Sequence, residues 1–166
     1  MTVQLQAPLD DRATWSPVGH CPIEKAMGVV GARPAMLLMR EAHYGTRRFD
    51  DFVTRVGVAP ATAATHLRNL TEAGLLERRP YQDDGARTRD EYVLTAAGAD
   101  LMPVVIGLFA WGIKYAGGSD QLELAHAGCA EPVQVTVACA AGHEVTEDDV
   151  EVRLRRPIGT TGRRRP

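Results

Sequence analysis

Apolar residues between positions 49 and 79 recur with the spacing of two short helices followed by a strand. The first helix has its apolar side chains at helical intervals, at Phe49, Phe52, Val53 and Val56. Gly57 ends this helix, and Pro60 follows in the first turn of a second one, where its missing N–H has no partner to lose. The spacing therefore predicts a helix-turn-helix.

The second helix has one apolar and one polar side. The apolar stripe, which must face a core, consists of Ala63, Leu67, Leu70 and Gly74. The other side carries small and polar side chains, which suit a helix lying in the major groove of DNA. These are Ala61, Thr62, Thr65, Arg68 and Asn69, flanked by His66. An ordinary amphipathic surface helix is equally consistent with these residues.

Two extended runs after the helix-turn-helix predict a β-hairpin. Residues 75–80 and 90–94 flank a turn with the sequence QDDGAR. A helix-turn-helix followed by a hairpin is a winged helix. Arg87 and Arg89 near the hairpin tip are placed to reach a phosphate or the minor groove. Arg48 and Pro60, at the starts of the two helices, complete the candidate DNA contacts.

Helices are also predicted on both sides of this unit. A first helix has Ile23, Ala26, Met27 and Val30 on its apolar side, and residues 34–44 form a second, strongly apolar helix. Thr95 is suited to cap a long helix after the hairpin, with a bend at Pro103. Its run LMPVVIGLFAW is apolar around most of the circumference. Pairing with a second copy would cover this surface; the alternative is a C-terminal segment that folds back over it.

Several segments between residues 21 and 112 match a known family in order and spacing. They are CPIEKAMGVVGAR (21–33), MLLMRE (36–41), RRFDDF (47–52), LRNLTEAGLLERR (67–79), EYVLTAAG (91–98), and LMPVV with Trp111-Gly112. Together they resemble the HxlR family of bacterial winged-helix transcriptional regulators, within the MarR-like superfamily. The resemblance implies a dimeric DNA-binding regulator without enzymatic activity.

The chain departs from the family pattern at three places. Arg33-Pro34 stands where the family usually has Lys-Trp, which removes an aromatic core residue. Ala59 stands where a serine commonly caps the recognition helix, a change that costs about 1 kcal/mol. Thr65 and His66 replace residues that are often basic, so we expect an operator sequence of its own.

The composition changes after residue 117, where we place a domain boundary. Residues 118–151 contain acidic side chains but no lysine or arginine, and alternating valines at 133, 135, 137, 150 and 152 predict a small β structure. We expect a flexible arm over residues 1–17, a winged-helix DNA-binding and dimerisation domain over 18–117, a β-rich acidic appendage over 118–155 and a basic disordered tail over 156–166. The fold class is therefore α+β. The arginines of the tail are either solvated or in contact with phosphate.

Composition favours a folded protein of the cytoplasm. Hydrophobic residues make up 45% of the chain, and no run approaches the roughly 20 consecutive apolar residues that span a bilayer. The N-terminus lacks the pattern of a secretory signal. The net charge of -2 does not favour nucleic-acid binding, but the acidic residues are concentrated after residue 117.

Two groups of residues suggest chemistry beyond DNA contact. Cys21 precedes the first helix, and a helix N-terminus stabilises a thiolate. The resemblance implies that a cysteine at this position senses oxidants or electrophiles. The simpler interpretation is a small residue buried at the start of a helix. His126, Cys129, Cys139 and His143 supply the four ligands of a tetrahedral structural zinc site. Related tails have Cys-x-x-Cys at the second pair, and Gly142 occupies the second cysteine position, so the site is either rebuilt with His143 or lost.

These observations predict a sequence-specific DNA-binding regulator. We expect a dimeric repressor that binds a double-stranded operator and responds to a redox, electrophile or small-molecule signal. No catalytic motif is present, and no cofactor is expected besides the structural zinc. The alternative is a winged-helix interaction module that recruits a protein or RNA partner through its acidic appendage.

Overall fold

The computed structural model describes residues 2–13, 19–82, 88–119 and 121–154, in two compact units. The larger unit comprises residues 19–135, and the smaller one combines residues 1–18 with 136–166. The predicted appendage, residues 118–155, is thus divided between the two units.

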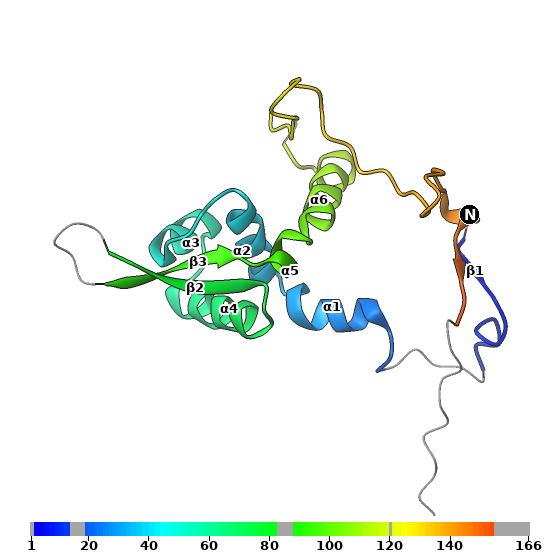
Figure 1. Ribbon diagram of the computed structural model, residues 1–166, viewed down its shortest axis with the longest axis horizontal. Helices are drawn as coiled ribbons and strands as arrows, with labels where there is room; N and C mark the ends of the chain where they lie inside the picture. The colour runs from blue at the N-terminus through cyan, green and yellow to red at the C-terminus, as the bar shows by residue number, and fades with distance from the viewer. Residues whose placement is uncertain (1, 14–18, 83–87, 120, 155–166) are drawn as a thin grey trace, which may run out of the picture. The chain divides into compact units, whose positions relative to one another are not determined.

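The larger unit is a winged helix, which confirms the predicted fold class. Its elements in chain order are α1 (Pro22–Val30), α2 (Arg33–His43), α3 (Phe49–Val56), α4 (Pro60–Glu72), β2 (Leu76–Tyr81), β3 (Arg89–Leu94), α5 (Ala96–Ala99) and α6 (Met102–Tyr115). Figure 1 shows α2, α3 and α4 gathered against the hairpin of β2 and β3.

A single core joins α2, α3, α4 and the hairpin. Its fully buried side chains include Leu38, Met39, Phe52, Leu67, Leu70 and Leu76. The predicted apolar stripe of α4 is confirmed at Ala63, Leu67 and Leu70, which are all inaccessible to solvent. The turn between α3 and α4 is tight because Gly57 adopts a left-handed conformation with φ 68°, which costs glycine little.

The hairpin is antiparallel and is tied to the residues before α3. Its register runs from Leu76 opposite Leu94 to Tyr81 opposite Arg89. The Tyr92 N–H donates to the Arg47 carbonyl oxygen at 2.9 Å. This bond fixes the base of the wing beside the first helix of the helix-turn-helix.

The single long helix predicted after Thr95 is instead two helices. Thr95 does cap the first of them, α5, since its Oγ1 accepts from the Gly98 N–H at 3.1 Å. The chain then breaks after Ala99, and α6 begins at Met102. Pro103 explains the break because it has no N–H for the Ala99 carbonyl, four residues earlier.

Most of α6 is exposed in the isolated chain. Val105 is its one buried residue, whereas Val104, Leu108, Trp111 and Tyr115 are each about half exposed or more. The stretch Ala96–Tyr115 has the length and composition of a membrane-crossing helix, with mean hydropathy 1.6. The sequence predicted no run long enough to span a bilayer, and one such helix is weak evidence for a membrane span.

The smaller unit pairs the two ends of the described chain. β1 (Gln4–Leu5) lies parallel to β4 (Glu151–Val152), and Leu9 is 2% exposed. A short 3-10 helix, Glu147–Asp149, directly precedes β4 in the chain. The sequence predicted a flexible arm over residues 1–17, so this pairing differs from the expectation for residues 4–5.

The valine-rich segment also differs from its expected form. Alternation of Val133, Val135 and Val137 predicted a strand, but the structure has isolated bridges only, at Ala125–Pro132 and Ala138–Glu144. The three valines are 37–61% exposed. Alternation alone does not make a strand, because each strand needs a neighbouring backbone to receive its hydrogen bonds.

Candidate nucleic-acid interface

Helix α4 presents a small, polar face to solvent. Ala61, Thr65 and Arg68 are exposed on it, together with Ala64. The Thr65 hydroxyl donates to the Ala61 carbonyl oxygen at 2.9 Å, and Arg68 Nε lies 4.0 Å from Glu72 Oε1. Small side chains let the helix backbone approach DNA closely, while the threonine and arginine can reach base edges.

Two of the predicted contacts also border a hollow beside α1. His66 and Asn69 line a hollow of about 280 Å³ that also includes Gly28 and Val29 of α1. Pro60 is exposed at the start of the helix. Ala61, Thr65, Arg68 and Asn69 of the predicted set are exposed on α4, whereas Thr62 and His66 are half-buried.

The end of the hairpin nearest its tip brings a second group of predicted residues together. The Arg48 guanidinium lies over the Tyr81 ring, 4.8 Å from its centroid. Arg48, Tyr81 and Arg89 share a hollow of about 480 Å³ with the carboxylates of Asp50, Asp51 and Asp90. Arg87, the other predicted wing contact, lies outside the described residues.

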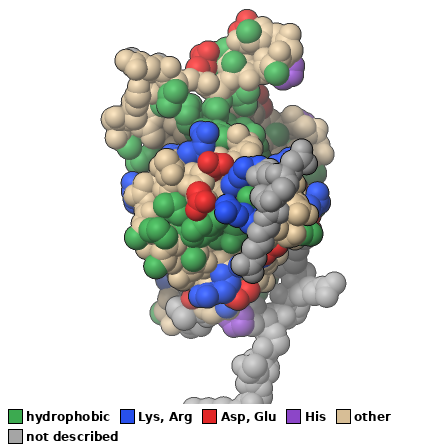
Figure 2. All heavy atoms as spheres, turned by 90° about the vertical axis from the view of Figure 1, so that its left-hand side faces the viewer, with side chains coloured by type: hydrophobic (Ala, Val, Ile, Leu, Met, Phe, Trp, Pro, Cys, Tyr) green, Lys and Arg blue, Asp and Glu red, His purple; other side chains and the backbone are tan. Residues whose placement is uncertain are grey.

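Further arginines near the wing were missing from the predicted set. Arg47 is 3.6 Å from Glu91, and Arg78 is 4.0 Å from Asp90. All four side chains are on the surface, where such pairs contribute little stability. Figure 2 shows basic side chains gathered on this face with acidic ones among them. The Arg47-Arg48 pair in the sequence was the available signal for the first of these.

Comparisons with known proteins agree with this geometry. The model of the HxlR-like helix-turn-helix family matches residues 29–120. The chain belongs to this family. An uncharacterized HTH-type transcriptional regulator of Mycobacterium tuberculosis is 35% identical over 131 residues, which cover 77% of this chain and 82% of the relative.

Solved structures show the same fold in regulators. PA1607, described as a candidate transcription factor, superposes with a TM-score of 0.72 at 29% identity, covering 82% of this chain and 96% of its own. The redox regulator HypR in its reduced form gives a TM-score of 0.53 at 26% identity, covering 58% and 94%. This HxlR-like protein is a helix-turn-helix transcriptional regulator, and its family implies DNA binding; no enzyme family is indicated.

Cys21 occupies the position that the sequence predicted for it. It is the N-cap residue of α1, directly before Pro22, and its side chain is half-buried. The thiol makes no capping hydrogen bond to the helix. The side chain is partly accessible to solvent, and a redox sensor must be accessible to its oxidant.

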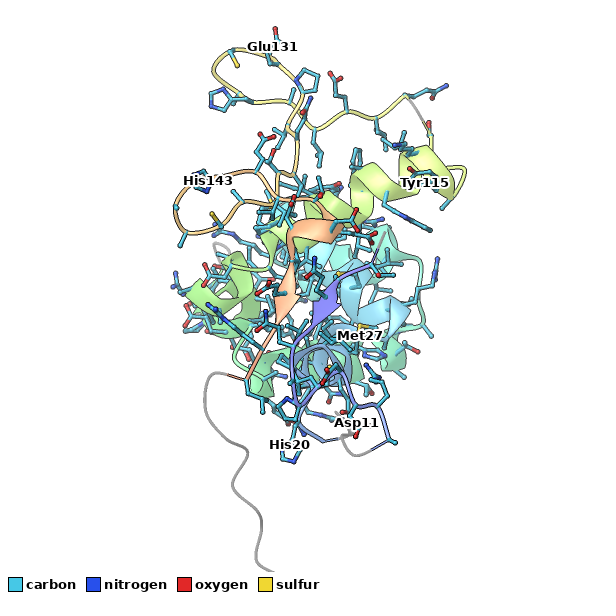
Figure 3. The ribbon with its side chains drawn as sticks, turned by 90° about the vertical axis from the view of Figure 1, so that its right-hand side faces the viewer. Asp11, His20, Met27, Tyr115, Glu131 and His143 are labelled. Carbon is cyan, nitrogen blue, oxygen red and sulfur yellow. The ribbon has the colours of Figure 1, made fainter. Side chains whose placement is uncertain are left out.

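The four predicted zinc ligands lie in two short turns, one in each unit. In the larger unit His126 Nδ1 is 3.3 Å from Cys129 Sγ, and Glu131 follows the turn (Figure 3). In the smaller unit Cys139 N–H donates to the His143 carbonyl oxygen at 2.9 Å. Backbone N–H groups, first that of Ala141 and then that of His143, lower the pKa of the Cys139 thiol.

A thiol with a lowered pKa is a better metal ligand, because the metal binds the thiolate. However, within the part of the chain that the structure describes, no three His, Cys, Asp or Glu side chains form a group that could hold a metal ion. The zinc site, His126 and Cys129 with Cys139 and His143, stays a prediction.

Proposed function

We propose that this protein is a cytoplasmic repressor that binds a specific DNA operator as a homodimer. The observation that carries the proposal is the exposed face of α4, which has small and polar side chains and no large apolar one. This face suits a helix that lies in the major groove of DNA, where small side chains permit a close approach of the backbone.

Each group of residues has a separate role in the proposal. Thr65 and Arg68 contact base edges in the major groove and set the sequence. Arg48 and Arg89 near the tip of the wing, with Arg87, contact phosphates. Arg47 and Arg78 form weak surface ion pairs with Glu91 and Asp90, so they can exchange a carboxylate for a phosphate at small cost.

The dimer is supported by an apolar stripe on α6. Val104, Leu108, Trp111 and Tyr115, which we call the α6 seam, follow one another at intervals of three or four residues and so share one side of the helix. The Trp111 and Tyr115 rings also contact each other, with centroids 5.8 Å apart. Exposed apolar surface of this extent marks an interaction site. A two-fold dimer would place two α4 helices on half-sites about one DNA turn apart.

The proposed signal that releases DNA is oxidation or alkylation of Cys21. Its support is the position of Cys21 and the similarity to a redox regulator. HypR, a redox regulator, shares the fold at 26% identity. Oxidation or alkylation of the half-buried Cys21 would add atoms at the start of α1, a helix whose last residue, Val30, is buried in the core. A small-molecule signal is a second route, and its site is argued below.

Mutants of the two groups of residues test the proposal. Arg68→Ala and Thr65→Ala should each weaken binding to operator DNA by about 1–3 kcal/mol and leave binding to random DNA unchanged. Arg89→Ala should weaken binding to both alike, as should Arg87→Ala, and reduce the salt dependence by about one ion. Arg33→Ala, an exposed arginine at the start of α2, is the control.

Wild-type affinity in both mutant classes by gel shift would contradict the assignment of contacts.

A salt titration distinguishes the DNA-binding regulator from the alternative interaction module. A steep fall of affinity for random duplex DNA with salt indicates several neutralised phosphates. A flat response would favour the interaction module that recruits a protein or RNA partner.

A further inference from the structure

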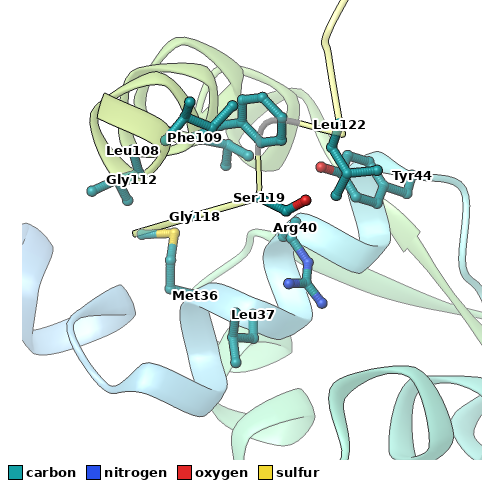
Figure 4. A pocket seen from close by; sticks show the side chains of 12 residues that line it. Met36, Leu37, Arg40, Tyr44, Leu108, Phe109, Gly112, Gly118, Ser119 and Leu122 are labelled. Atoms are coloured by element: carbon teal, nitrogen blue, oxygen red, sulfur yellow. The ribbon is translucent and has the colours of Figure 1, made fainter. Parts of the chain in front are cut away.

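An apolar cavity of about 290 Å³ lies between α2 and α6. Met36, Leu37 and Tyr44 line it from α2, and Val105, Phe109 and Ile113 line it from α6. The segment after α6 closes one side, and the Gly118 N–H donates to the Gly112 carbonyl oxygen at 3.0 Å. Figure 4 shows Met36 and Phe109 on opposite walls, with Ser119 and Leu122 on the closing segment.

The charges around the cavity are already compensated. Arg40 borders it, but its Nη2 donates to Glu41 Oε1 at 2.8 Å and its Nε donates to the same oxygen at 3.2 Å. Glu41 is buried and also accepts from the Thr46 hydroxyl. Among the described residues of the lining, Arg40 is the one charged side chain, and its pairing favours a neutral ligand. The neutral polar groups on the lining are the hydroxyls of Tyr44 and Ser119.

We propose that this cavity binds a small, neutral aromatic compound that acts as the effector of the regulator. Its volume is at the lower end of ligand sites, which begin at about 300 Å³. Methionine sulfur and the rings of Phe109 and Tyr44 favour an aromatic ring through dispersion and ring-edge contacts. One hydroxyl or carbonyl group on the ligand would pair with the Tyr44 or Ser119 hydroxyl.

A second copy of the chain does not fill the cavity in this arrangement. The α6 seam, through which the proposed dimer forms, lies on another side of the helix. Val105 and Phe109 each follow a seam residue by one position, which turns them by about 100° around the helix. Leu108 is the one seam residue that also borders the cavity. A partner helix on the seam therefore leaves the α2 side of α6 available to a ligand.

The cavity is placed to couple ligand binding to DNA affinity, and this part of the inference rests on the proposed function. Leu38 and Met39 of α2 share one buried core with Leu67 and Leu70 of α4. A ligand that separates α6 from α2 would change the position of α4 relative to the seam. In a dimer, this changes the distance between the two recognition helices.

Filling the cavity by mutation tests the site without DNA. A Cβ built at Gly112, on the cavity wall, meets no described atom within 4 Å, so Gly112→Leu fills the space without displacing a neighbour. Gly107 has the same freedom on α6 but does not line the cavity, so Gly107→Leu is the matched control. The probe is N-phenyl-1-naphthylamine, a neutral aromatic dye whose fluorescence rises in apolar sites.

The wild-type protein and Gly107→Leu should bind one dye per chain, and Gly112→Leu should weaken binding at least tenfold. Equal binding to Gly112→Leu, or no saturable binding to the wild type, would overturn the proposal. Should Gly112→Leu fold poorly by circular dichroism, Ser119→Leu fills the cavity from the exposed closing segment and must give the same loss.

Coupling is measured separately by fluorescence anisotropy of labelled operator DNA. Saturating dye should lower the affinity of the wild type at least fivefold and leave that of Gly112→Leu unchanged. Unchanged wild-type affinity would refute the effector role while the binding site itself stands. A protein that binds the dye but no DNA at all would refute the proposed function and not the site.

Discussion

Leu108→Asp should convert the proposed dimer into monomers. Leu108 is 49% exposed in the isolated chain, so about half of its side chain remains to be buried. Full burial of a leucine side chain stabilises by about 1.5–3 kcal/mol, so the remaining half contributes about 1 kcal/mol per protomer. Two-fold symmetry doubles this to about 2 kcal/mol.

The aspartate adds a larger penalty than the lost leucine. A carboxylate in an apolar seam costs several kcal/mol to desolvate, and the two copies would repel each other near the symmetry axis. A total of about 5 kcal/mol corresponds to a dimer dissociation constant raised by more than about 1,000-fold.

Sedimentation velocity at micromolar concentration measures this change. Wild type should sediment as a dimer and Leu108→Asp as a monomer with an unchanged circular dichroism spectrum. Val137→Asp is the control, since Val137 is 61% exposed but lies outside the larger unit. A wild-type monomer, or a Leu108→Asp dimer, would show that α6 does not form the interface.

Gly98→Ala should destabilise the winged helix by about 2–3 kcal/mol in urea titration, because its Cβ would overlap the Leu75 carbonyl oxygen; a wild-type midpoint would contradict this. Burial lowers the pKa of His43, so the stability of the fold should fall as pH drops below the ordinary value of 6.5, where the unfolded chain binds the proton more readily. His43→Leu should reduce this change of stability with pH, measured as the difference in thermal unfolding between pH 5 and pH 7. An unchanged difference would assign the pH dependence to another group. Cys21→Ser should keep DNA bound after treatment with a mild oxidant or quinone; release from the variant would place the sensor elsewhere. If the predicted zinc site forms, elemental analysis of protein without a His tag should find about one zinc per chain, and Cys139→Ser should lose it. Folded protein without zinc would rule the site out.

The winged helix could be predicted from sequence because local signals and core pattern agree there. Gly57 and Pro60 fix the turn between α3 and α4, and the stripe that includes Leu67 and Leu70 selects the buried side of α4. The break after Ala99 was also readable from Pro103, although the sequence analysis expected only a bend.

Other features depend on contacts between distant segments. The pairing of Gln4–Leu5 with Glu151–Val152 joins short strands without a distinctive pattern. The partial burial of His66 beside α1 depends on how α1 packs on α4, which periodicity within α4 does not determine. The cavity between α2 and α6 likewise arises only when two helices and the closing segment meet.

Selection of bound sequences from a random duplex DNA pool tests the central claim most directly. If two α4 helices of a homodimer read an operator, wild-type protein should enrich a dyad-symmetric sequence with half-site centres about 10 base pairs apart. Arg68→Ala should relax the selection at one position in each half-site, while Arg33→Ala should enrich the wild-type sequence. A pool that shows no enriched sequence, or one without dyad symmetry, would contradict the account.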